Sequence, residues 1–267
     1  MGTRNCSWII TLSLLVLALG TLLAGDLSDE EIADDVAKVK AMGLEHKDTS
    51  DSDLPMASRL YLAMRHCMDN ESLDALSVRD WPEMPNTFGQ WPYLGMTRLA
   101  DQGHGVAPEG DGDGALLGTI GSLLGFGPAF LTDWLEHDER SITLWHPGHA
   151  PRDVCDPATV RIGRHFNNNL PLVVNAQLAA DRPITLARLW RCDGRYQLTA
   201  FAARTAEPRR TLLGAHGVAL VEGRSLPERF DQLCHAGMPH HVTVFPGNQI
   251  DLLRRLARLM NVSWCDT

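Results

Sequence analysis

A repeating order of elements constrains the fold of this chain more than any single residue does. Two short apolar runs, residues 73–78 and 105–107, each lie between stretches with helical spacing of apolar residues, and each leads into an acidic loop. These loops are Trp81-Pro82-Glu83 and the Glu-Gly-Asp-Gly-Asp-Gly segment at 109–114. The order helix, strand, acidic loop, helix, strand, acidic loop, helix predicts an α/β sheet with ligands gathered at the carboxyl ends of its strands.

Periodicity and turn residues predict the other elements. Ser28 and the acids after it predict the start of a helix that ends near residue 43. Further helices are predicted at 54–68, 88–99, 115–124, 225–234 and 250–260, and further strands at 142–145, 183–192, 196–204, 217–221 and 241–245. Because the second half is richer in strands, three parts are expected: a hydrophobic leader (1–26), an α/β domain (27–150) and a β-rich domain (151–267).

The leader has the pattern of a targeting segment. Arg4 precedes the apolar run 8–24, and Ala18-Leu19-Gly20 is a passable small-residue cleavage site. The pattern is typical of a signal peptide or a short membrane anchor, so membrane contact is expected only through residues 8–24. A misassigned start is the alternative, and the lack of a disulfide pattern argues against export.

Charge and composition exclude some classes of function. The formal net charge of −9, with no basic stripe carrying interleaved aromatics, argues against a nucleic-acid partner. A hydrophobic content of 44% and a charged content of 21% are those of a soluble globular protein. The acidity fits a neutral sugar better than a phosphate-rich ligand.

The two acidic loops and the His240-His241 pair carry the candidate metal ligands. Two carboxylates and one imidazole at strand ends suit a divalent cation such as Mn²⁺ or Mg²⁺, with positions left for substrate oxygens. Each residue type also has an ordinary structural alternative: Glu83 as a solvated loop residue, and Asp111 with Asp113 as part of a glycine-rich turn. His240 and His241 on one strand would point to opposite faces, so at most one of them is expected to bind the ion.

A second histidine motif, His146-Pro147-Gly148-His149, follows the predicted strand at 142–145. It could bind metal, but the Pro-Gly pair more simply makes a tight turn that presents His146 to a ligand. Motifs for a serine nucleophile, a zinc protease or a phosphate-binding loop are not found in the sequence.

Six stretches together resemble the L-fucose isomerase family, whose neighbours include the L-arabinose isomerases. The resemblance runs from about residue 28 to the end and corresponds to the C-terminal two-thirds of the family, without its N-terminal domain. The matching stretches are 58–65, 73–83, 109–116, 127–134, 145–151 and 237–244. The resemblance implies a Rossmann-like α/β/α domain followed by a mainly β, barrel-like domain, in a cytoplasmic homo-oligomer.

The resemblance also implies roles for single residues. Glu83, Asp111 and His241 would bind Mn²⁺, and the two carboxylates would also carry the proton when an aldose and a ketose interconvert through an enediol. Two positions depart from the family's pattern: Asp80 stands where a cysteine is common, and Pro147-Gly148-His149 replaces Cys-Gly-Asn. The side chains expected to contact the sugar are Trp81, His146 and His240.

The sequence therefore predicts an aldose–ketose isomerase that acts on a free sugar with Mn²⁺, or with Mg²⁺ or another divalent cation in its place. A non-catalytic carbohydrate-binding or assembly module with the same fold is the first alternative, and an exported metal-binding protein is the second. The resemblance indicates the cytoplasm, whereas the leader indicates export or membrane anchoring.

Overall fold

The computed structural model of the chain describes residues 27–266, so the predicted leader (1–26) lies outside the described residues. None of the helices in the described range has the length and hydropathy needed to cross a membrane.

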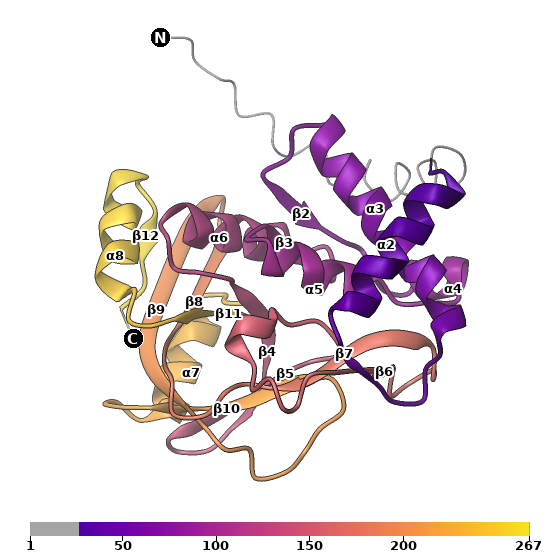
Figure 1. Cartoon of the computed structure of the whole chain (residues 1–267). Helices are drawn as coiled ribbons and strands as arrows, with labels where there is room; N and C mark the ends of the chain where they lie inside the picture. Colours follow the sequence, from indigo (N-terminus) through magenta and orange to yellow (C-terminus); the bar gives the residue numbers. More distant parts are fainter. Residues whose placement is uncertain (1–26, 267) are drawn as a thin grey trace.

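A closed barrel of six antiparallel strands dominates the lower half of the view in Figure 1. Its strands neighbour one another in the order β10, β5, β4, β11, β8, β9, and pairing of β9 with β10 closes the ring. The barrel-like part of the prediction is thus confirmed. The barrel strands are β4 (Phe130–His137), β5 (Ser141–His146), β8 (Pro183–Cys192), β9 (Arg195–Ala206), β10 (Ala215–Val221) and β11 (His241–Pro246).

The barrel begins earlier in the chain than the expected change near residue 150, because β4 and β5 are two of its strands. The predicted hairpin β8–β9 is confirmed, with Asp193 and Gly194 at positive φ in its two-residue turn. Outside the ring, β7 (Pro171–Gln177) pairs with β10. Strand β6 (Arg161–Arg164) pairs with β7, and β1 (Glu45–His46) pairs with β6. The remaining barrel-side elements are α7 (Leu226–His235), α8 (Ile250–Leu259) and β12 (Ser263–Trp264).

The α/β part is built on two parallel strands, β2 (Ala75–Ser77) and β3 (Gly105–Ala107). In the described range this sheet has two strands, so the larger, Rossmann-like domain is not shown. Five helices belong to the same part: α2 (Asp29–Ala41), α3 (Leu54–Asn70), α4 (Glu83–Phe88), α5 (Tyr93–Asp101) and α6 (Gly112–Leu123).

Local signals explain where these helices begin and end. The predicted cap of α2 is confirmed: the Ser28 hydroxyl accepts from the Glu31 backbone N–H, and the Glu31 carboxylate accepts from the Ser28 N–H. The helix predicted at 88–99 is wrong at its start. Phe88 instead ends α4, which Gly89 terminates at a φ of +64°, and α5 begins after Pro92.

Helix α6 joins the two parts of the molecule. It contacts β3 on one side and β8 and β11 of the barrel on the other. The loops that follow β2 and β3 are also joined, because the Gly110 backbone N–H donates to the Val78 carbonyl at 3.0 Å. Both acidic loops therefore lie at the carboxyl ends of parallel strands, as predicted.

Candidate functional site

Asp111 lies where the α/β part meets the barrel. It is the N-cap of α6, and its Oδ1 accepts the Gly114 backbone N–H at 2.8 Å. Arg188 of β8 donates to both carboxylate oxygens, at 2.5 and 3.0 Å. His241, the first residue of β11, places Nδ1 2.9 Å from Asp111 Oδ2. One carboxylate thus connects a helix and two barrel strands.

The other edge of the His241 ring faces further carboxylates. Its Nε2 lies 3.2 Å from Asp133 Oδ1 and 3.5 Å from Glu109 Oε2. His240 joins the same group, with Nε2 3.3 Å from Asp133 Oδ1. Possible ligand atoms of Glu109, His240 and His241 all lie within 4.8 Å of one another. We call these five side chains the His241 cluster: Glu109, Asp111, Asp133, His240 and His241.

The expectation that His240 and His241 point to opposite faces is wrong. Strand β11 begins at His241, so His240 belongs to the preceding bend and the alternation of a strand does not apply to it. The two rings are 4.4 Å apart and both face Asp133. Both histidines therefore belong to the same site.

The charges of the cluster shift the pKa of its members. Burial lowers the pKa of His241, but the nearby carboxylates of Asp111 and Asp133 outweigh it and raise the value to about 9. Burial likewise raises the pKa of Asp111, but hydrogen bonds from His241 and Arg188 hold it well below its usual range. At neutral pH His241 is thus an imidazolium that faces these carboxylates.

The donor set fits a divalent cation. Carboxylate oxygens and imidazole nitrogens are the ligands that Mn²⁺ and similar ions take. His241 is 4% exposed, and its Nε2 has no hydrogen-bond partner within residues 27–266. Glu109 and His240 are more open, with side-chain exposures of 39% and 64%. A group with a buried side and an open side can hold an ion and still admit a substrate.

Buried Asp80 fixes the two acidic loops relative to each other. Its Oδ1 accepts the Glu109 backbone N–H at 2.5 Å, and its Oδ2 accepts the Tyr93 hydroxyl at 2.6 Å. Glu109 itself has a φ of +59°, a conformation that non-glycine residues adopt infrequently. Asp80 therefore positions the start of the second acidic loop.

Glu83 stands apart from the group of three ligand atoms. It begins α4, and its Oε1 pairs with Arg79 at 2.8 Å. Its Oε2 is buried and has no hydrogen-bond partner in the described part of the chain. Its predicted roles as metal ligand and proton carrier stay predictions. Trp81, an expected sugar contact, is 51% exposed and stacks on Trp91 with ring centres 5.9 Å apart.

His146 ends β5 inside the protein and next to the cluster. It is fully buried, and its ring lies 6.3 Å from that of His241 and 6.0 Å from that of His149. Burial lowers the pKa of His146 well below its usual value and that of His149 to about 4, so both rings are neutral at neutral pH. Their ring nitrogens have no hydrogen-bond partner among the residues described. The role of His146 as a sugar contact stays a prediction.

Sequence reasoning missed Asp133 and Arg188. Both lie within apolar strand runs, Phe-Leu-Thr-Asp-Trp-Leu and Ile-Thr-Leu-Ala-Arg-Leu-Trp. A charged residue inside such a run is unusual unless it is paired, and that signal would have found them. Glu109 lies in the second acidic loop, two residues before the predicted ligand Asp111.

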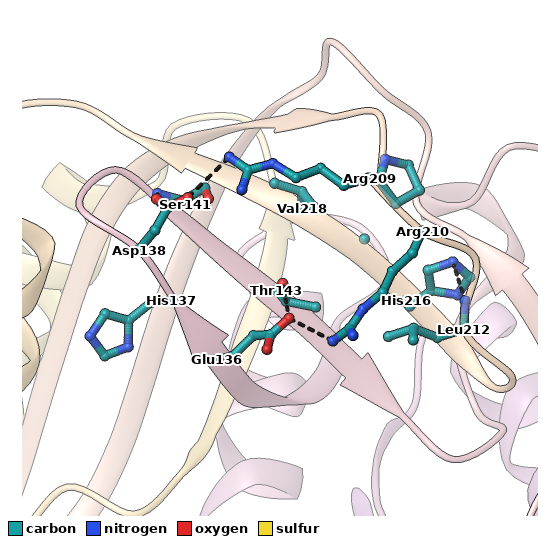
Figure 2. A pocket seen from close by; sticks show the side chains of 12 residues that line it. Glu136, His137, Asp138, Ser141, Thr143, Arg209, Arg210, Leu212, His216 and Val218 are labelled. Carbon is teal, nitrogen blue, oxygen red and sulfur yellow. Dashed lines mark hydrogen bonds and ion pairs between the residues drawn. The ribbon is translucent and has the colours of Figure 1, made fainter.

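A separate hollow lies on the barrel at the tip of the β4–β5 hairpin (Figure 2). Its charged side chains pair with one another: Arg210 with Glu136 at 2.8 Å, and Arg209 with Asp138 at 3.0 Å. Ser141, Thr143 and His216 supply further polar lining. Because its arginines and acids already neutralise each other, this hollow of about 340 Å³ offers a ligand less unpaired charge than the His241 cluster does.

Comparison with known proteins relates the chain to sugar isomerases. It is 24% identical to the sulfoquinovose isomerase of Priestia aryabhattai over 199 residues, which cover 73% of this chain and 44% of that protein. It is 27% identical to the sulfoquinovose isomerase of Clostridium sp. (strain MSTE9) over 241 residues, 88% of this chain and 53% of that protein. The chain thus spans about half the length of the curated relatives it matches. No family model matches it.

These relatives support the predicted resemblance at the level of a sugar isomerase family. They name a different sugar from L-fucose. The similarity alone shows neither specificity for fucose nor dependence on Mn²⁺.

Proposed function

We propose that this chain carries the catalytic site of an aldose–ketose isomerase that acts on a free sugar with a divalent cation, Mn²⁺ first. The observation that supports this most is the His241 cluster, which gathers three carboxylates and two imidazoles at the junction of barrel and α/β part. The similarity to sulfoquinovose isomerases over most of the chain supports the same reaction class.

Isomerisation moves a proton between C1 and C2, so it needs a proton carrier and a positive charge near the sugar oxygens. A bound divalent cation would supply that charge and help to orient the sugar. Hydrogen bonds within the chain orient the site: Arg188 and the α6 N-terminus hold Asp111 in place, and Asp111 holds His241. Glu109 and His240, which are exposed, form the face that a sugar can reach.

Glu83 and Asp111 are the proposed proton carriers. Asp111 is held ionised, but both of its oxygens already accept hydrogen bonds. Glu83 keeps one oxygen without a partner among the described residues, so of the two it is the better placed to take a proton. Neutral His146, beside the cluster, is the proposed polar contact for a sugar hydroxyl, with Trp81 and His240 nearer the surface.

The proposal includes three broader features that the resemblance implies. The parallel pair β2–β3, with α5 in the crossover between them, would be part of a Rossmann-like layer. The protein would be a cytoplasmic homo-oligomer. The substrate would be an aldose, with sulfoquinovose tested beside L-fucose because the relatives carry that name.

Solvent exchange at C2 tests the reaction. The full chain with Mn²⁺ should transfer deuterium from D₂O to C2 of an accepted aldose, which NMR detects without a coupled enzyme. His241→Asn should abolish the exchange, whereas Asp113→Asn should retain it, since Asp113 faces Tyr196 and Arg191 instead of the cluster. Equal exchange in the wild type and in His241→Asn would refute the assignment of this site.

The same experiment separates the alternative function. A chain that binds a sugar, as judged by ligand-observed NMR, but exchanges no C2 proton with any aldose would be a carbohydrate-binding module. That outcome has a physical basis, because turnover requires a substrate that is held in the reactive orientation, whereas binding does not.

A further inference from the structure

We propose that a divalent cation binds at the Nε2 atom of His241, together with Glu109 and His240, and that Asp111 positions His241 instead of binding the ion. This inference deepens the proposed function and rests on it for the requirement of a cation. It differs from the set that the resemblance implies, in which Glu83 and Asp111 bind the ion with His241. The two sets share only His241, so an experiment can separate them.

The Nε2 atom of His241 is buried and faces two carboxylates without hydrogen-bonding to either. It lies 3.2 Å from Asp133 Oδ1 and 3.5 Å from Glu109 Oε2, yet the described residues offer it no partner with hydrogen-bond geometry. Buried polar atoms are almost always satisfied by protein, water or an ion. A cation at this point would satisfy a deprotonated Nε2 and the carboxylates together.

The spacing of the three ligand atoms fits a shared ion. Donor atoms bound to one ion at about 2.1 Å lie no more than about 4.2 Å apart. The possible ligand atoms of Glu109, His240 and His241 lie within 4.8 Å of one another without an ion. Glu109 and His240 are the exposed members of the group, so they can close the remaining few tenths of an ångström without repacking the core.

Asp111 has little capacity left for an ion. A carboxylate offers about four acceptor positions, and Asp111 uses four: the Gly114 N–H, two donors from Arg188, and His241 Nδ1. Arg188 is 5% exposed, so an ion that displaced it would leave a buried guanidinium without its anion. Asp111 instead accepts the Nδ1–H of His241, which leaves Nε2 as the metal-binding nitrogen.

The backbone directs Glu109 toward the ion. Its N–H is held by the buried Asp80 carboxylate at 2.5 Å, and its φ of +59° is maintained there. Glu83 is the rival ligand, because its Oε2 is also buried and without a partner in the range described. Its other oxygen pairs with exposed Arg79, and Glu83 is outside the group of atoms within 4.8 Å.

The first test measures Mn²⁺ binding by the full chain, without sugar, from the EPR signal of free Mn²⁺. Glu109→Gln should weaken binding by more than the roughly 10- to 100-fold that is typical of an outer-shell change. Asp111→Asn should stay within that range, because the Asn carbonyl can still accept the Nδ1–H. Glu83→Gln and the control Asp113→Asn should leave binding unchanged.

The second test needs no substitution at Asp111. In the ¹⁵N-histidine-labelled full chain with Cd²⁺, NMR should show His241 Nε2 bound to the metal and Nδ1 still protonated. His241→Asn assigns the signals. A metal-bound Nδ1 would overturn the proposal. So would strong loss of Mn²⁺ affinity in Glu83→Gln with normal affinity in Glu109→Gln, or no Mn²⁺ binding by the wild type.

Neither test uses isomerase activity, so their outcomes are separate from those of C2 exchange. Binding at Nε2 without exchange would keep this site and reject the isomerase. Exchange with the ion bound at Nδ1 would keep the isomerase and reject this ligand set.

Discussion

Asp80 is a buried acid whose two oxygens hold the backbone of Glu109 and the hydroxyl of Tyr93. Burial raises the pKa of Asp80 to about 6, and these hydrogen bonds offset the rise only in part. The ionised carboxylate is thus kept in an unfavourable place because it connects the two acidic loops. This is a local loss of stability that serves the geometry of the site.

That pKa predicts how stability depends on pH. The folded state holds the Asp80 proton more tightly than the unfolded state does, with values of about 6 and 3.9. Its contribution to stability is therefore full below about pH 4 and lost as pH rises through 6, a change of about 3 kcal/mol. Asp80→Asn removes this titration while its amide can still meet both partners.

Urea unfolding between pH 4.5 and 7.5, with chelator present, checks this prediction. The variant should gain stability relative to the wild type as pH rises through the window. A difference between the two proteins that stays constant with pH would contradict it.

At the same scale, the predictable residues were those that lie next to a glycine or proline at the end of a strand. Asp111 and His241 were predicted as neighbours because glycine and proline mark the ends of their strands, and the structure places them 2.9 Å apart. Asp133 and Arg188 were not predicted. A charged residue within an apolar strand run indicates a paired side chain, but it does not show which distant residue is its partner. Only the pairing of β4 with β11 brings Asp133 beside His241.

Helices α2 and α5 are joined by a buried ion pair. Arg98 donates to both oxygens of Asp35 at 2.7 Å, the two side chains are 9% and 2% exposed, and the guanidinium lies 3.6 Å from the centre of the Tyr61 ring. Because removing one partner leaves a buried charge, Asp35→Ala should lower the free energy of unfolding by about 3–5 kcal/mol.

Arg209→Ala is the matched control for that prediction. It breaks the exposed Arg209–Asp138 pair of Figure 2 and should cost about 0–1 kcal/mol. Chemical denaturation of both variants supplies the comparison. Similar losses in the two would show that the Asp35–Arg98 pair gains little from its burial.

Elements with local signals were predicted, and elements defined by distant partners were not. The capping box of α2 and the Asp-Gly turn between β8 and β9 act within a few residues, so both were found in the sequence. Strand β4 was missed, and so was closure of the ring by β9 and β10, because strand pairing depends on contacts between residues far apart in sequence. A Rossmann-like sheet was expected from resemblance, but the described residues show only a two-stranded sheet, β2–β3, in this part.

On the scale of the whole molecule, the candidate site contains residues from both the barrel and the α/β part. Glu109 follows β3 of the α/β part, whereas His241 begins a barrel strand, and Asp111 with Arg188 joins them through α6. An ion bound by residues of both parts adds a contact between the barrel and the α/β part. Only the folded state has this contact. The site should therefore couple the stability of the barrel to that of the α/β part.

This coupling predicts that Mn²⁺ stabilises the full chain. At a free concentration of about 100 times Kd, a ligand specific for the folded state adds about 2.7 kcal/mol. For a chain of this size, that should raise Tm by roughly 5–10 °C. Calorimetry with Mn²⁺ and then with excess chelator should show the rise and its reversal. His241→Asn should show neither, because it removes the ligand common to both possible sets. An equal rise in that variant would mean that Mn²⁺ stabilises the protein from elsewhere, and the His241 cluster would then not be the site that links the barrel to the α/β part.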